Sequence, residues 1–137
     1  GRERGEMLSS NSLFNAAAVN HFHTGTNRPY ILDDNNRARF FRGTNFVQKG
    51  WPWYPEVLLN ETNVARLAEL GFNTIRLGFM WTGAQPEAGS YNTTYYGIMK
   101  GIVETLAKYD IYAFLDVHQD VMSSYYCLYD AFPQWAV

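Results

Sequence analysis

The chain has 137 residues, of which 47% are hydrophobic and 18% are charged, so its composition is that of one globular domain rather than of a disordered segment. Its formal net charge of −2 at pH 7 provides no basic surface for nucleic acid or for an anionic membrane. No apolar run reaches the roughly 18 residues that a membrane-spanning helix needs. The aromatic content is high, at 17%. Aromatic faces stack on sugar rings, although aromatic residues more often fill a core.

The first 28 residues are mostly polar and show no clear periodicity. We expect residues 1–28 to be a leader or loosely ordered arm, and no signal peptide is visible in them. The chain begins with Gly1 rather than methionine and ends on an apolar stretch without a turn or cap. We therefore interpret it as an N-terminal fragment of a longer protein. The single cysteine, Cys127, either pairs with a cysteine further along that protein or is a free thiol.

From residue 29 the sequence predicts alternating strands and helices. Residues 30–46 are predicted as a hairpin, with turn-forming residues at 33–36 and a second arm, residues 39–46, that is the first core strand. A loop over 47–59 leads to a helix that begins near residue 60 or 62. The apolar positions of this helix recur with a period of 3.6, and Gly71 follows them, where a helix C-cap is expected.

The second half repeats this alternation. Residues 73–81 are predicted as a strand, residues 82–92 as a loop marked by proline and glycine, and residues 94–109 as a helix. A last strand, residues 111–117, follows directly. Two N-x-S/T sequons, at Asn60 and Asn92, fall at predicted loops or helix starts. Such sequons accept N-glycans in secreted proteins but are common by chance.

The element order is therefore β-α-β-α-β, and the strands are too apolar to leave one face in water. This pattern predicts an α/β fold with parallel strands covered by helices. A doubly wound nucleotide-binding sheet would carry a glycine-rich turn after the first strand, where this chain has the aromatic sequence "GTNFVQKGWPWYP". We therefore expect residues 29–137 to form the first three βα units of a (β/α)8 TIM barrel, which is incomplete at this length.

In such a barrel the active site lies at the carboxyl ends of the strands. Asn45 and Lys49 come at or after the end of the first strand, residues 76–81 end the second, and residues 116–120 end the third. Side-chain alternation places Arg76 on the face opposite to Ile75 and Leu77, so Arg76 is expected to point into the barrel and to need an acidic partner.

The segments "NTIRLGFMWTGAQPEAGSYNTTY" and "LDVHQDVMSSYYC", together with the first loop "KGWPWYP", resemble the endoglycoceramidases of glycoside hydrolase family 5. The resemblance covers about residues 29–137. It implies a TIM barrel and a glycosidase that hydrolyses the β-glycosidic bond between the oligosaccharide and the ceramide of glycosphingolipids, with retention of configuration. Together with the two sequons, the resemblance leads us to expect a secreted or extracellular protein, including one of a lysosomal or digestive lumen.

The resemblance also gives roles to individual residues. Arg76 resembles the arginine that holds the nucleophilic glutamate, and His118 resembles the histidine that hydrogen-bonds the sugar beside the scissile bond. The residues that resemble ligands of sugar hydroxyl groups are Lys49, Asp116 and Asp120. Trp81 and the pair Trp51 and Trp53 are candidates for stacking on a sugar or for the mouth of a lipid groove.

A retaining glycosidase needs two carboxyl groups roughly 5–5.5 Å apart. In the family that the chain resembles, both belong to glutamates at the ends of the fourth and seventh strands, so we expect neither within these 137 residues. The glutamates that we expect not to be catalytic are Glu56, Glu61, Glu69, Glu87 and Glu104. We also expect the 137 residues alone to lack activity and to fold poorly, because three units leave open strand edges.

Several alternatives stay open. Arg76 could belong to a purely structural ion pair, His118 could be a core histidine, and Lys49 could be a solvated loop residue. Asp116, His118 and Asp120 could also bind a divalent metal in a metal-dependent hydrolase. The whole protein could instead be another family 5 β-glucanase or β-glucosidase, or a carbohydrate-binding barrel without activity. We expect no cofactor and no metal, and we expect the partners to be a glycosphingolipid or oligosaccharide, with a possible contact to a lipid surface and none to nucleic acid.

Overall fold

The computed structural model describes residues 22–24, 29–123, 125–126, 129–130 and 132–137. The prediction for residues 1–21 and 25–28, like the pairing of Cys127, lies outside these residues. The chain divides into two compact units, Gly1–Phe40 and Phe41–Val137. None of the helices in the described part of the chain is long and apolar enough to cross a membrane.

The first unit contains a two-stranded antiparallel sheet. Strand β1 (His23–Thr24) pairs with β2 (Ile31–Leu32), so a strand lies within the segment that we predicted as an arm. The predicted turn at 33–36 is present, and a single bridge between Leu32 and Ala38 closes it. The hairpin is therefore shorter than predicted, and its second arm ends where the amide of Arg39 donates to the carbonyl of Ile31, at 2.9 Å.

Asp33 explains why this turn is so short. Its carboxylate is fully buried and accepts hydrogen bonds from the backbone amides of Asn35 and Arg37 and from the guanidinium groups of Arg37 and Arg39. The pKa of Asp33 is lowered to about 2, chiefly by the backbone hydrogen bond from Arg37 and against the effect of burial. The carboxylate thus holds both arginines at the turn, so Arg39 is not part of a core strand.

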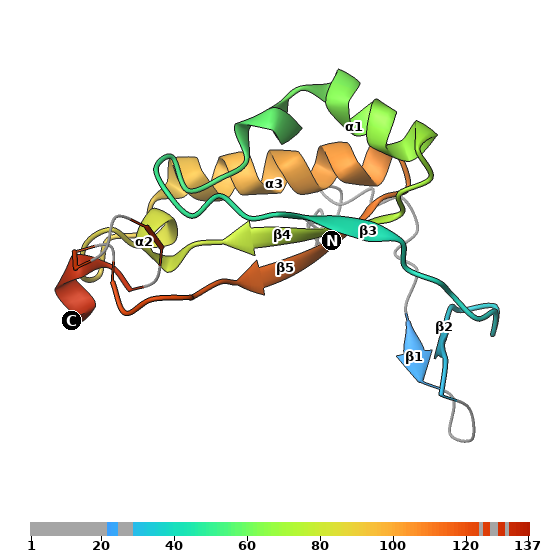
Figure 1. Cartoon of the computed structure of the whole chain (residues 1–137), viewed down its shortest axis with the longest axis horizontal. Helices are drawn as coiled ribbons and strands as arrows, with labels where there is room; N and C mark the ends of the chain where they lie inside the picture. Colours follow the sequence, from blue (N-terminus) through green and yellow to red (C-terminus); the bar gives the residue numbers. More distant parts are fainter. Residues whose placement is uncertain (1–21, 25–28, 124, 127–128, 131) are drawn as a thin grey trace, which may run out of the picture. The chain divides into compact units, whose positions relative to one another are not determined.

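The second unit contains a parallel sheet with the strand order β3-β4-β5 (Figure 1). Its strands are β3 (Gly43–Phe46), β4 (Thr74–Phe79) and β5 (Tyr112–Val117). The register sets Asn45 beside Arg76 and Arg76 beside Phe114. The backbones of β3 and β4 approach closely at Gly43, where an added Cβ would lie 2.2 Å from the carbonyl oxygen of Thr74.

Both predicted helices are present, as α1 (Glu61–Glu69) and α3 (Thr93–Lys108). The sequon residues Asn60 and Asn92 are their N-caps, and each side chain accepts a hydrogen bond from a backbone amide of the first turn. Gly71 has a φ of 79° and ends α1, as predicted. Three short helical turns were not predicted: η1 (Glu56–Leu59) in the first predicted loop, α2 (Trp81–Ala84) from the last residue of the predicted strand 73–81 into the second loop, and η2 (Gln134–Ala136) near the end of the chain.

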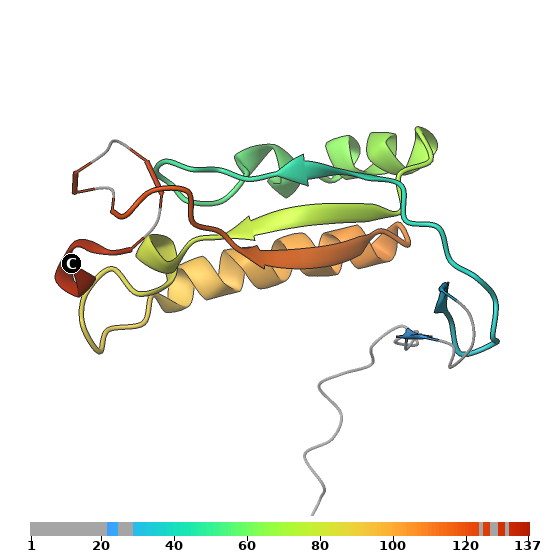
Figure 2. The ribbon, with the colours of Figure 1, turned by 60° about the horizontal axis from the view of Figure 1, so that its bottom comes forward.

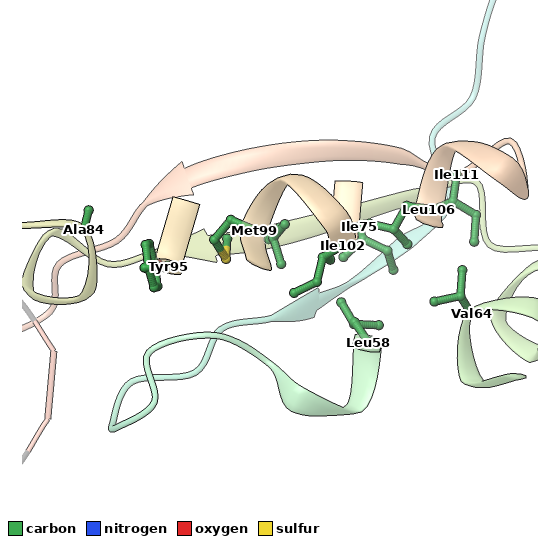
Figure 3. Packing of buried hydrophobic residues seen from close by; sticks show 10 residues of the cluster. Leu58, Val64, Ile75, Ala84, Tyr95, Met99, Ile102, Leu106 and Ile111 are labelled. Atoms are coloured by element: carbon green, nitrogen blue, oxygen red, sulfur yellow. The ribbon is translucent and has the colours of Figure 1, made fainter. Parts of the chain in front are cut away.

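The core lies between the sheet and the helices α1 and α3, which cover the same face of the sheet (Figure 1). Ile75 and Leu77 point into this core, whereas Arg76 lies on the other face, as the alternation predicted. The buried cluster, shown in Figure 3, consists of Leu58, Val64, Ile75, Leu77, Ala84, Tyr95, Met99, Ile102, Leu106 and Ile111.

The strand β5 forms an edge of this sheet and is poorly covered among the described residues. Phe114 is 64% exposed, Leu115 is 53% exposed and Val117 is 75% exposed, so large apolar side chains on both faces of β5 are accessible to water. Burying apolar area of this size stabilises a fold, and leaving it exposed is unusual. The predicted α/β class with parallel strands is confirmed. The exposed side chains of β5 mark the edge of the sheet to which a further strand could pair.

Candidate active site

Polar side chains gather where the three parallel strands end. The strands point the same way, so their carboxyl ends meet at one edge of the sheet (Figure 2). Lys49 lies in the loop after β3, Arg76 belongs to β4, and Asp116 belongs to β5. His118 and Asp120 follow β5 directly. The structure therefore brings five of the predicted residues to the same end of the sheet.

Arg76 and Asp116 form an ion pair between neighbouring strands, with 2.8 Å between Nη2 and Oδ2. The same carboxylate oxygen lies 2.7 Å from Nδ1 of His118. Asp116 is thus shared by a guanidinium and an imidazole. Arg76 therefore has the acidic partner that we expected. Among the described residues this partner is Asp116 on the neighbouring strand β5.

His118 is the most enclosed of these groups, with a side chain that is 10% exposed. Its Nε2 atom lies 3.3 Å from Asp120 Oδ2 and 3.4 Å from Asp130 Oδ2. The ammonium group of Lys49 also contacts Asp120, and both of these side chains are 41% exposed. Lys49 and Asp120 therefore form the accessible part of the site, and His118 forms its enclosed centre.

Asp130 belongs to this site, and the sequence analysis missed it. Its side chain is fully buried, and its backbone amide donates to the carbonyl of Lys49 at 2.6 Å. This hydrogen bond joins the loop after β5 to the loop after β3. Asp130 is the only acid in the aromatic stretch 124–132, and that isolation is the signal that could have identified it.

The three tryptophans proposed for stacking lie in different surroundings. The indole of Trp81 donates to Gln85 Oε1 at 3.0 Å and packs edge-on against Phe132 and Trp135. Trp53 packs against the core, and its carbonyl accepts a hydrogen bond from Tyr95. Trp51 is 81% exposed. Of the three, Trp51 offers the most free aromatic surface to a ligand.

The five glutamates that we expected not to be catalytic belong to helices or to a loop, and none of them lies in a strand of the parallel sheet. Glu61 and Glu69 belong to α1 and Glu104 to α3, where all three are exposed. Glu61 instead contacts Lys108 at 3.2 Å. Glu56 starts η1, and Glu87 lies in the loop before α3, where it bridges to Ser90.

The cluster also has the ligand types of a cation site. One atom each from His118, Asp120 and Asp130 lies within 4.8 Å of the other two. However, the ammonium group of Lys49 already contacts Asp120 and supplies positive charge there. A lysine beside the ligands opposes the binding of a divalent cation through charge repulsion. Hydroxyl groups, which both donate and accept hydrogen bonds, suit the exposed Lys49 and Asp120 better.

Comparisons with known proteins show the family to which this chain belongs. Residues 32–136 match the family model described as cellulase (glycosyl hydrolase family 5). In alignments 113 residues long, which cover 78% of this chain and 22% of each relative, the chain is 47% identical to an endoglycoceramidase of Cyanea nozakii and 42% identical to one of Hydra vulgaris. The chain thus spans about a fifth of the length of these relatives.

A solved structure gives the same result. Endo-glycoceramidase II from Rhodococcus sp. superposes with a TM-score of 0.69 at 30% identity, over 80% of this chain and 26% of that one. The family model extends over most of the described residues, including all three parallel strands and the residues at their ends. On these grounds the chain belongs to glycoside hydrolase family 5.

Proposed function

We propose that the protein containing this chain is a glycosidase that hydrolyses the β-glycosidic bond between the oligosaccharide and the ceramide of glycosphingolipids, with retention of configuration. Two observations carry the proposal: the 47% identity to an endoglycoceramidase over 78% of this chain, and the match of residues 32–136, which include the whole strand-end cluster, to the family model. The type of side chain in that cluster also supports it, because charged groups form strong hydrogen bonds to sugar hydroxyls.

The proposed architecture is a (β/α)8 barrel of which this chain supplies the first three βα units. The exposed edge strand β5 supports this, because a fourth strand would pair with it and cover its apolar side chains. The face of the sheet that carries Arg76 would then line the barrel interior. The isolated chain would keep this edge and face open, which supports our expectation that it folds poorly and is inactive alone.

Within the site we propose three roles. Lys49 and Asp120, which are accessible, bind sugar hydroxyl groups. Asp116 and His118 complete this binding surface from the end of β5, and Arg76 holds the nucleophilic carboxylate beside Asp116. The nucleophile and the acid/base are glutamates on later strands of the barrel, because no glutamate in the described residues lies at a strand end.

We further propose a secreted or luminal location. Both sequon asparagines lie at helix N-caps, and Asn60 is exposed, which makes its amide accessible to modification. Substrate in a lipid surface would meet the strand-end side of the sheet, where the exposed Trp51 offers an aromatic contact.

The experiment is hydrolysis of a glycosphingolipid, fluorescently labelled in its ceramide, by the full-length protein. Release of labelled ceramide together with the intact oligosaccharide is expected. Asp120→Asn should slow the release, and the control Asp110→Asn, at the exposed end of α3, should not. Release of single sugars, or a preference for soluble β-glucans, would favour another family 5 hydrolase. Glycan binding without any product would favour a non-catalytic barrel.

A further inference from the structure

Tyr129 is an exposed aromatic residue beside the strand-end cluster, and the site described above does not use it. It is 43% exposed. The ammonium group of Lys49 lies over its ring, 6.0 Å from the ring centroid. Lys49 and Asp120, whose side chains are both 41% exposed, form the accessible part of the site. An aromatic face therefore borders the charged groups that are open to a ligand.

The backbone holds Tyr129 at this place. The amide of the next residue, Asp130, donates to the carbonyl of Lys49 at 2.6 Å, so the loop after β5 is joined to the loop after β3 directly beside Tyr129. The loop of Tyr129 is also closed on itself, because the amide of Phe132 donates to the carbonyl of Met122 at 3.2 Å. The position of Tyr129 relative to Lys49 thus does not depend on the contact between their side chains.

The contact with Lys49 does not by itself account for the exposed ring. A distance of 6.0 Å is at the outer limit, about 6 Å, at which a cation attracts an aromatic face. The ammonium group of Lys49 also pairs with Asp120. Two other tyrosines of the same loop, Tyr125 and Tyr126, pack edge-on against each other with ring centroids 5.1 Å apart. Within the described residues no ring packs on Tyr129 in this way, so its ring is open to a ligand.

We propose that Tyr129 is a sugar-binding residue, on whose ring one pyranose of the oligosaccharide stacks while its hydroxyl groups bind Lys49 and Asp120. A pyranose has C–H groups on its faces and hydroxyl groups around its edge. The tyrosine ring provides an apolar contact for the C–H face. The ammonium group donates to hydroxyl oxygens, and the carboxylate accepts hydrogen bonds from hydroxyl groups. The three side chains together thus match both kinds of surface of one sugar ring.

The nature of the ligand rests on the proposed function, whose substrate contains both an oligosaccharide and a ceramide. The charged groups beside Tyr129 favour the oligosaccharide. A hydrocarbon chain lying on the ring would remove water from Lys49 and Asp120 without replacing its hydrogen bonds, which is costly. Sugar hydroxyl groups replace those hydrogen bonds. Tyr129 therefore belongs to a subsite for the sugar and not to one for the lipid.

The test is the binding of lactose, a β-linked disaccharide, to the full-length protein, measured by titration calorimetry. Tyr129→Leu removes the aromatic face and should raise the Kd of lactose about tenfold. Tyr129→Phe keeps the face and should bind lactose within about twofold of the wild type. Tyr126→Leu is the matched control, because Tyr126 belongs to the same loop and is 63% exposed, and it should leave the Kd unchanged.

A second measurement separates stacking from an effect on the shape of the loop. An aromatic ring shifts the NMR signals of C–H protons that lie on its face upfield. Lactose bound to the wild type and to Tyr129→Phe should therefore show upfield-shifted C–H signals, and lactose bound to Tyr129→Leu should lose this shift. A tyrosine that only positions Lys49 would change the affinity without producing the shift.

Equal affinities of the wild type and Tyr129→Leu would overturn the proposal. So would a wild type that does not bind lactose, or one whose bound lactose shows no upfield shift, and these two measurements need no variant. An equal loss of affinity in Tyr126→Leu would contradict a specific role of Tyr129. A short-chain ceramide whose binding is weakened by Tyr129→Leu, while that of lactose is not, would assign the ring to the lipid instead. Lactose binding is measured without turnover, so absence of glycosphingolipid hydrolysis would contradict the proposed function and leave this result readable.

Discussion

Arg76 on β4 and Asp116 on β5 form an ion pair of 2.8 Å that runs diagonally between the strands, because the register sets Asp116 beside Gly78 rather than beside Arg76. The side chain of Arg76 therefore extends toward the carboxyl ends of the strands, where the other polar groups lie. The same carboxylate oxygen of Asp116 also lies 2.7 Å from Nδ1 of His118. Two adjacent strand ends are thus joined by one carboxylate.

Arg76→Lys in the full-length protein should lower kcat strongly, by about 1.5–3 kcal/mol of transition-state stabilisation, with only a modest loss of fold stability. The planar guanidinium can contact Asp116 and a second carboxylate together, and an ammonium group cannot reproduce that geometry. Arg66→Lys, on the exposed side of α1, is the control and should be neutral. Steady-state kinetics and thermal unfolding measure the two effects. Normal turnover in Arg76→Lys would make Arg76 a structural ion-pair residue.

His118→Ala should reduce kcat/KM by about 2–4 kcal/mol, because it removes the group that joins Asp116 to Asp120. Asp120→Asn should have a smaller effect, since the amide keeps an acceptor oxygen for a sugar hydroxyl. The check is the kinetics of both variants, together with a wild-type assay in the presence of a chelator, which should stay active. A larger loss in Asp120→Asn than in His118→Ala would reverse the proposed order of importance.

Tyr95 joins three segments through one buried hydroxyl group. The hydroxyl accepts from the amide of Met80, at 2.9 Å, and donates to the carbonyl of Trp53, at 3.2 Å. Tyr95→Phe leaves both backbone groups without this partner and should destabilise the protein by about 1–3 kcal/mol. Tyr96→Phe is the matched control, because Tyr96 is exposed and its ring contacts persist in phenylalanine. Urea unfolding of both variants decides the matter, and equal stabilities would contradict the role of the hydroxyl.

The raised pKa of Tyr95 also predicts that the stability of the protein falls at alkaline pH. Burial raises the pKa of Tyr95 from 10.0 to about 12. A raised pKa means that the folded state keeps its proton while the unfolded state loses it, so the stability due to Tyr95 is complete below pH 10 and is lost as the pH rises toward 12. The difference in unfolding free energy between wild type and Tyr95→Phe should therefore shrink over this range. A difference that does not change with pH would contradict the raised pKa.

The sequence predicted the regular elements well, because their signals are local. Gly71 marks the end of α1, the helix starts predicted near residues 60–62 and 94 agree with α1 and α3, and strand alternation separates Arg76 from its apolar neighbours. The start of β3 was wrong by four residues, since nothing local in the sequence shows that Asp33 draws Arg39 back into the first hairpin.

The residues of the candidate site that lie at the end of a single strand could be predicted from the sequence. The residue that joins the site through a contact between two loops could not. Asp116, His118 and Asp120 are neighbours in the sequence, and their contacts follow from that spacing. Asp130 reaches His118 through a loop that a single backbone hydrogen bond joins to Lys49, and no sequence motif encodes that bond. Long-range contacts of this kind determine which buried acid belongs to a site.

The most direct measurement of the central claim, that this strand-end cluster binds the sugar of a glycosphingolipid, is a crystal structure of the full-length protein with the oligosaccharide headgroup bound. The account predicts sugar hydroxyl oxygens at hydrogen-bond distance, about 2.7–3.2 Å, from Lys49 Nζ and the carboxylate of Asp120, with Asp130 buried behind His118. A headgroup bound away from Lys49 and Asp120, or a metal ion held by His118, Asp120 and Asp130, would contradict it.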